Sequence, residues 1–448
     1  MAPVAIHETA YTNGSAVKSW KPVAVSSNVQ RISNPIREII ANINLSAPPE
    51  EGVDKPLINL GLGDPSVFGN FPPAPESIKA IEDSLKSGRA LGYPESVGYP
   101  DAREAVANYF SDPEGGNFRP TAADVVLAHG ASGALDMAIN VLCDKTKNVL
   151  FPKPLFTAYE TMSSLSDVEI RYYNLLPESN WEVDLAHLES LIDENTAFVM
   201  LNNPSNPCGS NYSEAHLRDI AAVMERHRVV VVSDEVYAGL AWDVTGPRPA
   251  HADAPRIEGK FNRGVFTPYT DVCGPAPVLV IGAVSKRWLF PGMRTGWVIV
   301  HDPLGVLKEV RGGLAKWAFR IQGPNSVIQR ALPALLTNTP EKFYLDTMDE
   351  LKKTSEALFA RLSKIPGLKP LMPQGAMYLM CGGLENFDLA DDKAFVEALH
   401  EEERVFILPG ACFRLPGFMR FVTTTPLPVL LDAADRIEAF CARHKKST

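Results

Sequence analysis

Short apolar runs alternate with helical patterns from about Leu57 to Arg330, and this alternation leaves few architectures open to the chain. Seven runs rich in large apolar residues are strand candidates: residues 125–127, 149–151, 170–173, 197–201, 229–232, 278–281 and 297–300. Apolar runs without alternating polar residues are typical of strands buried on both faces. Strands that alternate with helices form a mostly parallel sheet with helices on both faces. The sequence therefore predicts an α/β fold around a seven-stranded, mostly parallel sheet.

Composition excludes several classes of protein. The chain has 448 residues and a net charge of −10, whereas proteins that bind nucleic acid need a basic face. No run approaches the ~18 apolar residues of a membrane span, and residues 1–21 lack the apolar core of a signal peptide. The six cysteines show no C-x-x-C pair or zinc spacing, which predicts reduced thiols and no metal site. We expect a cytoplasmic protein that binds neither nucleic acid nor a membrane.

A lysine and an arginine follow the sixth strand candidate. Lys286 follows the apolar residues 278–284 after one serine, and Arg294 lies eight residues further on, past a proline and a glycine. The amine of a desolvated lysine can form a Schiff base, and the planar guanidinium of an arginine suits a phosphate. Pyridoxal 5'-phosphate needs both groups, one for its aldehyde and one for its phosphate. The alternative interpretation is a surface lysine in a loop.

A carboxylate follows the neighbouring strand candidate. Four consecutive valines at 229–232 precede Asp234, which therefore lies at the carboxyl end of a buried strand, where ligands bind in parallel sheets. A carboxylate there can pair with a protonated pyridine nitrogen, although Asp234 could equally cap a helix.

Two further strand ends carry polar or small residues. The turn-forming string at 202–209 follows the run 197–201. The small residues 130–134 follow the run 125–127 and open a helical pattern. Backbone N–H groups at such a helix start can bind a phosphate.

With these motifs in hand, the chain resembles the fold-type I pyridoxal-phosphate aminotransferases over nearly its whole length. The strings that carry the resemblance are residues 33–37, 60–65, 67–70, 172–177, 203–209, 234–237, 284–297 and 375–380. Within the family, the strings at 64–70 and 173–177 favour the branch that transaminates aromatic amino acids, tyrosine first, with a 2-oxo acid such as 2-oxoglutarate or pyruvate as acceptor.

The resemblance implies a fold-type I architecture, with a large domain and a smaller α+β domain built from both chain ends. We predict a mobile arm over 1–28, an N-terminal part of the small domain over 29–56, the large cofactor-binding domain over 57–335 and the small C-terminal domain over 336–448. The Pro- and Gly-rich segment 245–277 is predicted to be an irregular surface excursion.

For the cofactor, the resemblance implies a role for each matching residue. Lys286 would hold pyridoxal 5'-phosphate covalently and later move a proton, and Asp234 would pair with the ring nitrogen. The other implied cofactor contacts are Asn206 and Tyr237 at the ring's 3-oxygen, Phe156 on the ring face, and Ala131, Ser132 and Arg294 at the phosphate. Many members have a serine where this chain has Ala283, and Ser285 is the candidate to replace it.

For the substrate and the assembly, the resemblance implies five further residues. Arg420 would bind the α-carboxylate, with Asn206 beside it. Gly63 would let the backbone approach the substrate, and Asn34 and Ile36 would line the side-chain pocket. Tyr93 resembles a tyrosine that reaches the phosphate of a neighbouring subunit, which implies a homodimer with shared sites; the alternative is ordinary loop packing.

Two questions stay open at this level. Arg320 is a candidate partner for the distal carboxylate of a diacid, but the string around it matches poorly. Alanine- or kynurenine-type aminotransferases and pyridoxal-phosphate lyases share the fold and cofactor residues. A non-catalytic regulator is disfavoured because the catalytic set is retained.

Overall fold

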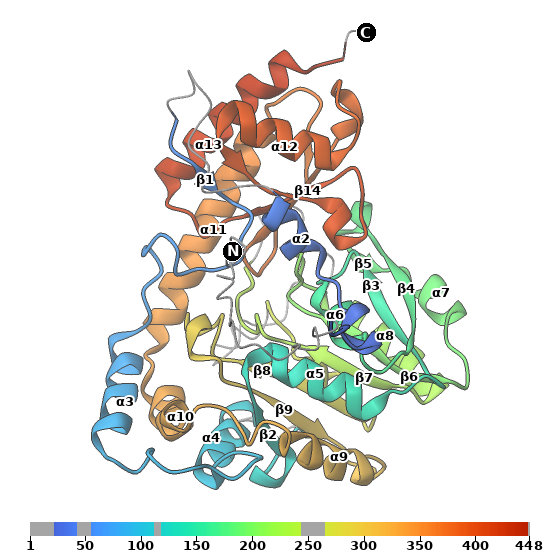
Figure 1. Ribbon diagram of the computed structural model, residues 1–448, viewed down its shortest axis with the longest axis vertical. Helices are drawn as coiled ribbons and strands as arrows, with labels where there is room; N and C mark the ends of the chain where they lie inside the picture. Colours follow the sequence, from blue (N-terminus) through green and yellow to red (C-terminus); the bar gives the residue numbers. More distant parts are fainter. Residues whose placement is uncertain (1–21, 43–54, 112–117, 243–264, 447–448) are drawn as a thin grey trace, which may run out of the picture.

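The computed structural model describes residues 22–42, 55–111, 118–242 and 265–446. Most of the predicted arm at 1–28 and of the predicted excursion at 245–277 lies outside these residues. The described residues form a large α/β unit and a smaller unit beside it, joined by the long helix α11 (Glu341–Leu362) along one side of the molecule (Figure 1). None of the described helices is long and apolar enough to cross a membrane.

An eight-stranded sheet forms the centre of the large unit, with the spatial order β2-β9-β8-β7-β6-β3-β4-β5. In that order the strands are β2 (Val125–Ala128), β9 (Gly296–His301), β8 (Val278–Ala283), β7 (Val230–Asp234), β6 (Thr196–Asn202), β3 (Asn148–Lys153), β4 (Glu169–Leu176) and β5 (Glu182–Val183). All seven predicted strands are present, and the α/β fold is confirmed. The prediction missed β5, because a two-residue edge strand leaves no apolar run in the sequence.

The sheet is mostly parallel, as predicted. Strands β8, β7, β6, β3 and β4 pair in parallel, whereas β9 runs antiparallel to both β8 and β2. Successive residues of the central strands enter two different cores; for example, Val231 packs on one face and Val232 on the other. Both faces are therefore dry, which explains the uninterrupted valine run.

Helices cover both faces of this sheet (Figure 1). Those of the large unit are α3 (Pro75–Lys86), α4 (Pro100–Phe110), α5 (Gly130–Leu142), α6 (Ala158–Ser163), α7 (Leu185–Ser190), α8 (Glu214–His227), α9 (Lys308–Ala318) and α10 (Ser326–Asn338). Residues of α4, α8 and α10 enter one core, and residues of α5 and α9 enter the other. The two helical layers leave the carboxyl ends of the parallel strands facing the smaller unit.

The smaller unit has its own sheet and core. Its four-stranded antiparallel sheet has the order β10-β11-β14-β13, and a separate parallel pair joins β1 to β12. Its elements are β1 (Ile58–Asn59), β10 (Lys369–Pro370), β11 (Tyr378–Gly382), α12 (Asp392–Glu403), β12 (Val405–Phe406), β13 (Leu408–Pro409), β14 (Met419–Val422) and α13 (Leu427–Arg443). Near the N-terminus, the short helices α1 (Ser27–Gln30) and α2 (Pro35–Asn42) precede them.

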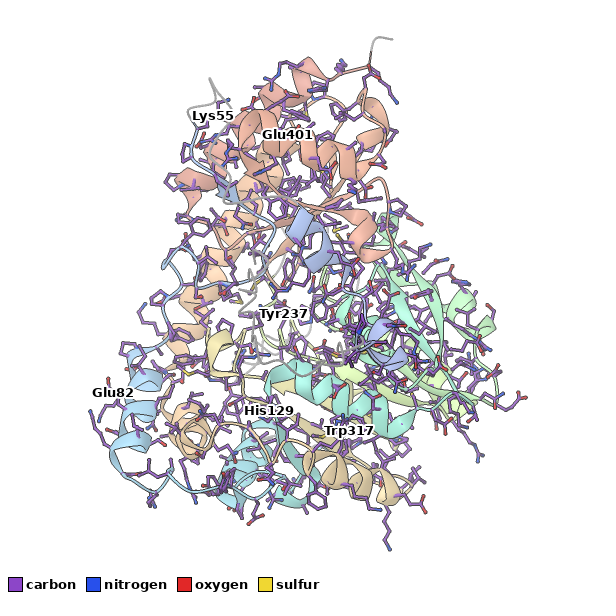
Figure 2. The ribbon with its side chains drawn as sticks, in the orientation of Figure 1. Lys55, Glu82, His129, Tyr237, Trp317 and Glu401 are labelled. Atoms are coloured by element: carbon purple, nitrogen blue, oxygen red, sulfur yellow. The ribbon has the colours of Figure 1, made fainter. Side chains whose placement is uncertain are left out.

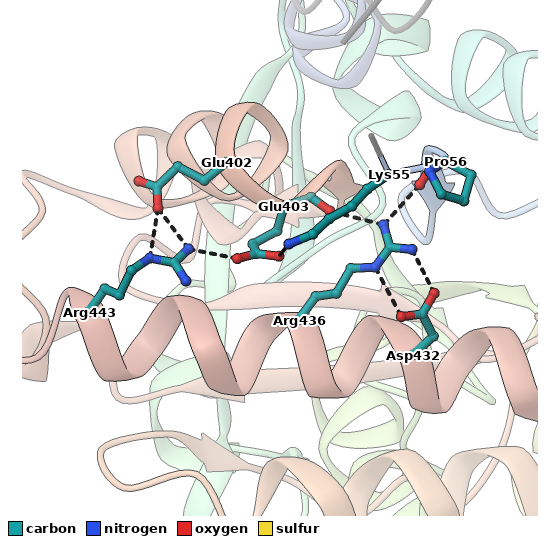
Figure 3. A network of polar contacts seen from close by, with 7 residues as sticks. All are labelled: Lys55, Pro56, Glu402, Glu403, Asp432, Arg436 and Arg443. Carbon is teal, nitrogen blue, oxygen red and sulfur yellow. Dashed lines mark hydrogen bonds and ion pairs between the residues drawn. The ribbon is translucent and has the colours of Figure 1, made fainter. Parts of the chain in front are cut away.

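A buried carboxylate ties the N-terminal segment to the C-terminal helices. The Glu403 side chain is 2% exposed and accepts from Lys55 Nζ at 2.5 Å and from Arg443 Nη2 at 2.7 Å (Figure 3). Arg436 donates to the carbonyl of Pro56 at 2.9 Å and forms two bonds to Asp432 (Figure 3). Pairing of this kind offsets the cost of burying a charge. The network holds residues 55–56 against α12 and α13.

Candidate active site

Three strand ends converge where the large sheet meets the smaller unit. Asp234 is the last residue of β7, and Asn202 ends the adjacent β6 in register with it. Lys286 follows β8, whose Ile281 pairs with Asp234 on the other side. Because neighbouring parallel strands end at the same edge, side chains far apart in the sequence meet here.

The Lys286 amine reaches across to the N-terminal part of the chain. Its Nζ donates to the carbonyl oxygen of Gly63 at 2.5 Å and lies 5.9 Å from the centre of the Tyr237 ring. A side chain at Gly63 would collide with Tyr378, since an added Cβ would lie 2.4 Å from that hydroxyl. Glycine at position 63 therefore keeps the backbone next to the lysine.

Asp234 is a buried carboxylate without a cationic partner among the described residues. Its side chain accepts from Tyr159 Oη at 2.6 Å and from the Val236 N–H at 3.3 Å, and the residue is 3% exposed. Burial raises the pKa of Asp234 to about 6, and the two hydrogen bonds only partly offset this effect. A cation placed beside this carboxylate would stabilise its ionised form and lower the pKa again.

A tyrosine pair links the two units above Asp234. The hydroxyls of Tyr237 and Tyr378 share a hydrogen bond of 2.7 Å, and their rings meet edge to face at 5.8 Å. Tyr237 follows β7, whereas Tyr378 opens β11 of the small sheet. Tyr237 lies in the middle of the molecule, between α5 and the smaller unit (Figure 2).

The small sheet supplies a buried arginine. Arg420 lies in β14, is 3% exposed, and donates to Asn206 Oδ1 at 2.9 Å and to the Gly61 carbonyl at 2.5 Å. Its Nε has no hydrogen-bond partner, and no carboxylate among the described residues pairs with it. Burial lowers the pKa of Arg420. The guanidinium is thus held in place with donor capacity left for an incoming carboxylate.

The start of α5 lies directly against the Arg294 guanidinium. Gly130, with φ +69°, begins α5, and a Cβ there would lie 2.8 Å from Arg294 Nη2. Ala131 and Ser132 follow in the first helical turn, where free backbone N–H groups point outward. Arg294 adopts φ +47° and donates to the Pro291 carbonyl at 2.9 Å. The N–H groups and the guanidinium together suit a phosphate.

These groups surround a single cavity of about 410 Å³. The predicted residues that line it are Asn34, Ile36, Gly63, Ala131, Ser132, Phe156, Asn206, Asp234, Tyr237, Ser285, Lys286, Arg294 and Arg420. The lining includes four cationic side chains and one carboxylate, Asp234. The cavity is therefore suited to ligands that carry several negative charges.

Two predicted residues lie elsewhere. Tyr93 is 91% exposed and lines a neighbouring depression, which meets the main cavity at Arg294. Arg320 is exposed, and its guanidinium stacks 4.1 Å above the Trp317 ring. Neither side chain enters the cavity of its own chain.

Several cavity residues were missed from the sequence. Tyr378, Asn202 and Arg37 line the cavity, and Tyr159 donates to Asp234 without lining it. None of the four received a role, although all of them bond to predicted residues. Tyr378 and Arg37 stand inside strings that carry the family resemblance, which could have flagged them. Asn202 opens the turn-forming string at 202–209, one residue before the resemblance string at 203–209. Tyr159 had no such signal, because a tyrosine near a helix start is common.

A second buried carboxylate, that of Glu235, lies beside Asp234. It should make the stability of the folded protein depend on pH. Glu235 accepts from Ser233 Oγ at 2.9 Å and from the Tyr269 N–H at 3.0 Å, and burial raises its pKa to about 7. A raised carboxyl pKa means that the folded state holds its proton while the unfolded state has lost it, so stability falls as pH rises from about 4.5 to about 7.

Replacing Glu235 by glutamine keeps the acceptor oxygen and removes the ionisation. We expect Glu235→Gln to stabilise the protein by about 1–3 kcal/mol at pH 8 and to change little at pH 5. Thermal unfolding at the two pH values measures the difference. An equal effect at both values would show that Glu235 stays ionised in the folded protein.

Comparison with known proteins places this site in a family. The family model for aminotransferase class I and II matches residues 55–437. Tyrosine aminotransferase of Mus musculus is 41% identical over 414 residues, covering 92% of this chain and 86% of the relative. Tyrosine aminotransferase of Dictyostelium discoideum is 38% identical and covers 96% and 98%. The crystal structure of tyrosine aminotransferase from Leishmania infantum superposes with a TM-score of 0.85 at 31% identity, covering 96% and 100%. The chain belongs to the class I and II aminotransferases.

Proposed function

We propose that the chain binds pyridoxal 5'-phosphate and transaminates aromatic L-amino acids. Tyrosine is the first donor and a 2-oxo acid is the acceptor, so that the products are 4-hydroxyphenylpyruvate and the acceptor's amino acid. The observation that carries the proposal is the convergence of Lys286, Asp234 and Arg420 on one cavity. The names of the relatives support the choice of tyrosine.

The residues of the cavity fit the cofactor. Asp234 is buried without a cation, so a protonated ring nitrogen would supply the missing charge. Arg294 and the N–H groups of Ala131 and Ser132, which line the cavity together, would hold the phosphate. Asn206 and Tyr237 would bond to the ring's 3-oxygen, and Phe156 would cover one ring face. Ser285, buried beside the lysine, is the remaining contact proposed.

Different residues of the chain would then perform the proton transfer and the substrate binding. When bound, the cofactor supplies an aldehyde that captures amino groups and a conjugated ring that draws electrons from the substrate Cα. Lys286 would take the proton from Cα and return it to the neighbouring cofactor carbon. Arg420 would hold the α-carboxylate, since its side chain lines the cavity and has no carboxylate partner among the described residues. Gly63, Asn34 and Ile36 would line the path of the side chain.

The test is a coupled assay on the cofactor-loaded protein. Donors would include tyrosine, phenylalanine, tryptophan, alanine and kynurenine, each with 2-oxoglutarate and pyruvate. Tyrosine should give the highest kcat/KM, with one 2-oxo acid formed for each acceptor aminated. Negligible turnover of tyrosine with every acceptor would reject the proposal in favour of an alanine- or kynurenine-type enzyme or a lyase.

We also propose that the working form is a homodimer with shared sites. Tyr93 is exposed in the depression that also contains Arg294. Three apolar residues in the segments that form this depression are exposed as well: Leu91, Phe319 and Ile321. Exposed apolar groups of this kind mark interaction surfaces. A second copy of the chain that covers these apolar residues would have Tyr93 of the first copy close to its own phosphate position.

The six free, buried cysteines support a reducing compartment such as the cytoplasm.

Shared sites predict complementation between two inactive variants. Tyr93→Phe should weaken cofactor retention about tenfold without changing the unfolding temperature, because one hydrogen bond to a charged group is lost. Lys286→Ala and Tyr93→Ala subunits, mixed and reassembled, should regain part of the activity in hybrid dimers. A fully active monomer at assay concentration would contradict the shared site.

A further inference from the structure

The cavity contains one more cation than the proposed reaction uses. Its four cationic side chains are those of Lys286, Arg294, Arg420 and Arg37. In the proposed function, the first attaches the cofactor, the second binds its phosphate and the third binds the α-carboxylate. Arg37 is left without an anion.

Arg37 is not occupied by the protein itself. Among the described residues its guanidinium has no ion pair or hydrogen bond, and only its backbone N–H is engaged, donating to Asn34 Oδ1 at 3.1 Å. The adjacent Glu38 carboxylate is used elsewhere, since it accepts from Ser33 Oγ at 2.7 Å and from the Asn34 N–H at 3.1 Å. The Arg37 side chain is exposed at the rim of the cavity and can bind an incoming anion.

The helix that carries Arg37 is fixed against both units. Thr161 of α6 donates its hydroxyl to the Ser33 carbonyl at 2.7 Å, just before α2 begins. Ile36 and Ile39 of α2 pack against the core of the smaller unit. In Figure 1, α2 lies between the smaller unit and α6. These contacts hold the Arg37 backbone in place while its side chain remains free to move.

We propose that Arg37 binds the second carboxylate of dicarboxylic 2-oxo acids and amino acids, the four- and five-carbon diacids. This inference rests on the proposed function, because it assumes that Arg420 holds the first carboxylate. The planar guanidinium fits a carboxylate through two parallel N–H donors. When an aromatic substrate occupies the cavity, the same flat cation can stack on its ring or withdraw into water. One side chain would thus serve both substrate classes.

The rival candidate within the chain is Arg320. Its guanidinium lies over the Trp317 ring. Burial raises the pKa of the nearby Asp136 carboxyl, and the positive charge of Arg320 partly offsets this rise. It does not line the cavity. The geometry therefore favours Arg37 for the diacid.

Binding of unreactive acids to the cofactor-loaded protein tests the proposal without turnover. Glutarate represents diacids and 3-phenylpropionate represents aromatic monoacids, with Kd measured by calorimetry. Arg37→Gln should raise the Kd of glutarate about tenfold, the effect of losing one partly solvated charge-assisted bond, and leave 3-phenylpropionate within about twofold. Arg37→Lys should restore part of the glutarate affinity. In turnover, Arg37→Gln should raise the KM for 2-oxoglutarate but not for pyruvate.

The matched control is Arg31→Gln. Arg31 is an exposed arginine of the same segment, 3.6 Å from Asp167 and outside the cavity lining, so neither Kd should change. Equal weakening of both acids by Arg37→Gln would overturn the proposal and assign Arg37 a structural role. Selective loss of glutarate in Arg320→Gln, with Arg37→Gln normal, would move the site to Arg320. Wild-type protein that binds 3-phenylpropionate but not glutarate would reject the Arg37 proposal alone, whereas failure to bind either acid would reject the proposed function too.

Discussion

Replacing Lys286 by alanine is expected to lower the rate of transamination by about 10³-fold or more, the range that a general base contributes. The lysine is the one amine that lines the cavity among the described residues, and its Nζ is held at 2.5 Å from the Gly63 carbonyl. Single-turnover measurements of the cofactor-loaded variant with tyrosine would give the rate.

Chemical mapping supplies an independent readout for Lys286. Borohydride reduction of the cofactor-loaded wild-type protein should fix the cofactor on the peptide that contains Lys286. Lys79→Ala is a suitable control, because Lys79 is an exposed lysine of α3 paired with Asp83 at 2.7 Å. A label on another lysine, or a Lys286→Ala variant with near-normal turnover, would reject the assignment.

Replacing Arg420 by leucine is expected to harm every substrate by a similar factor. Removing one partner of a desolvated, hydrogen-bonded charge pair costs about 2–5 kcal/mol, which corresponds to about 30- to 4,000-fold in kcat/KM. All donors and acceptors share the α-carboxylate, so tyrosine, phenylalanine, pyruvate and 2-oxoglutarate should lose equally. Parallel kcat/KM measurements on the four substrates give the comparison.

Stability separates this effect from simple unfolding. Arg420 is a buried cation without a carboxylate among the described residues, and such a charge lowers stability in the empty site. We therefore expect the unfolding temperature of Arg420→Leu to stay level or rise while activity falls. A loss confined to diacids would contradict the role of Arg420 as the α-carboxylate site, and a large drop in unfolding temperature would attribute the lost activity to unfolding.

The predicted division into domains remains a proposal. Ile58 and Leu60 belong to the core of the smaller unit, and β1 pairs with β12. This packing supports a boundary just after residue 60 in place of the predicted one at 57. The sequence offered no signal for the difference, because β1 is only two residues long and its partner lies near residue 405.

The sequence by itself determined the strands and the chemical character of the site. A strand buried on both faces requires an apolar run at consecutive positions, so β7 and β8 are visible in their own residues. Lys286, Asp234 and Arg294 were identified for a similar reason, since each stands in a local motif at a strand end.

Only the tertiary structure decided which of these residues meet. The spatial order of the strands and the reversed direction of β9 depend on contacts between distant segments, which no local pattern encodes. Arg420, Tyr378 and Arg37 reach the cavity because the smaller unit and α2 pack over the ends of the large sheet. The exposure of Tyr93 and the absence of Arg320 from the cavity likewise follow from packing. Local residue patterns indicate which residues are buried and what chemistry they can perform. Which distant residues come into contact depends on how the helices and sheets pack together.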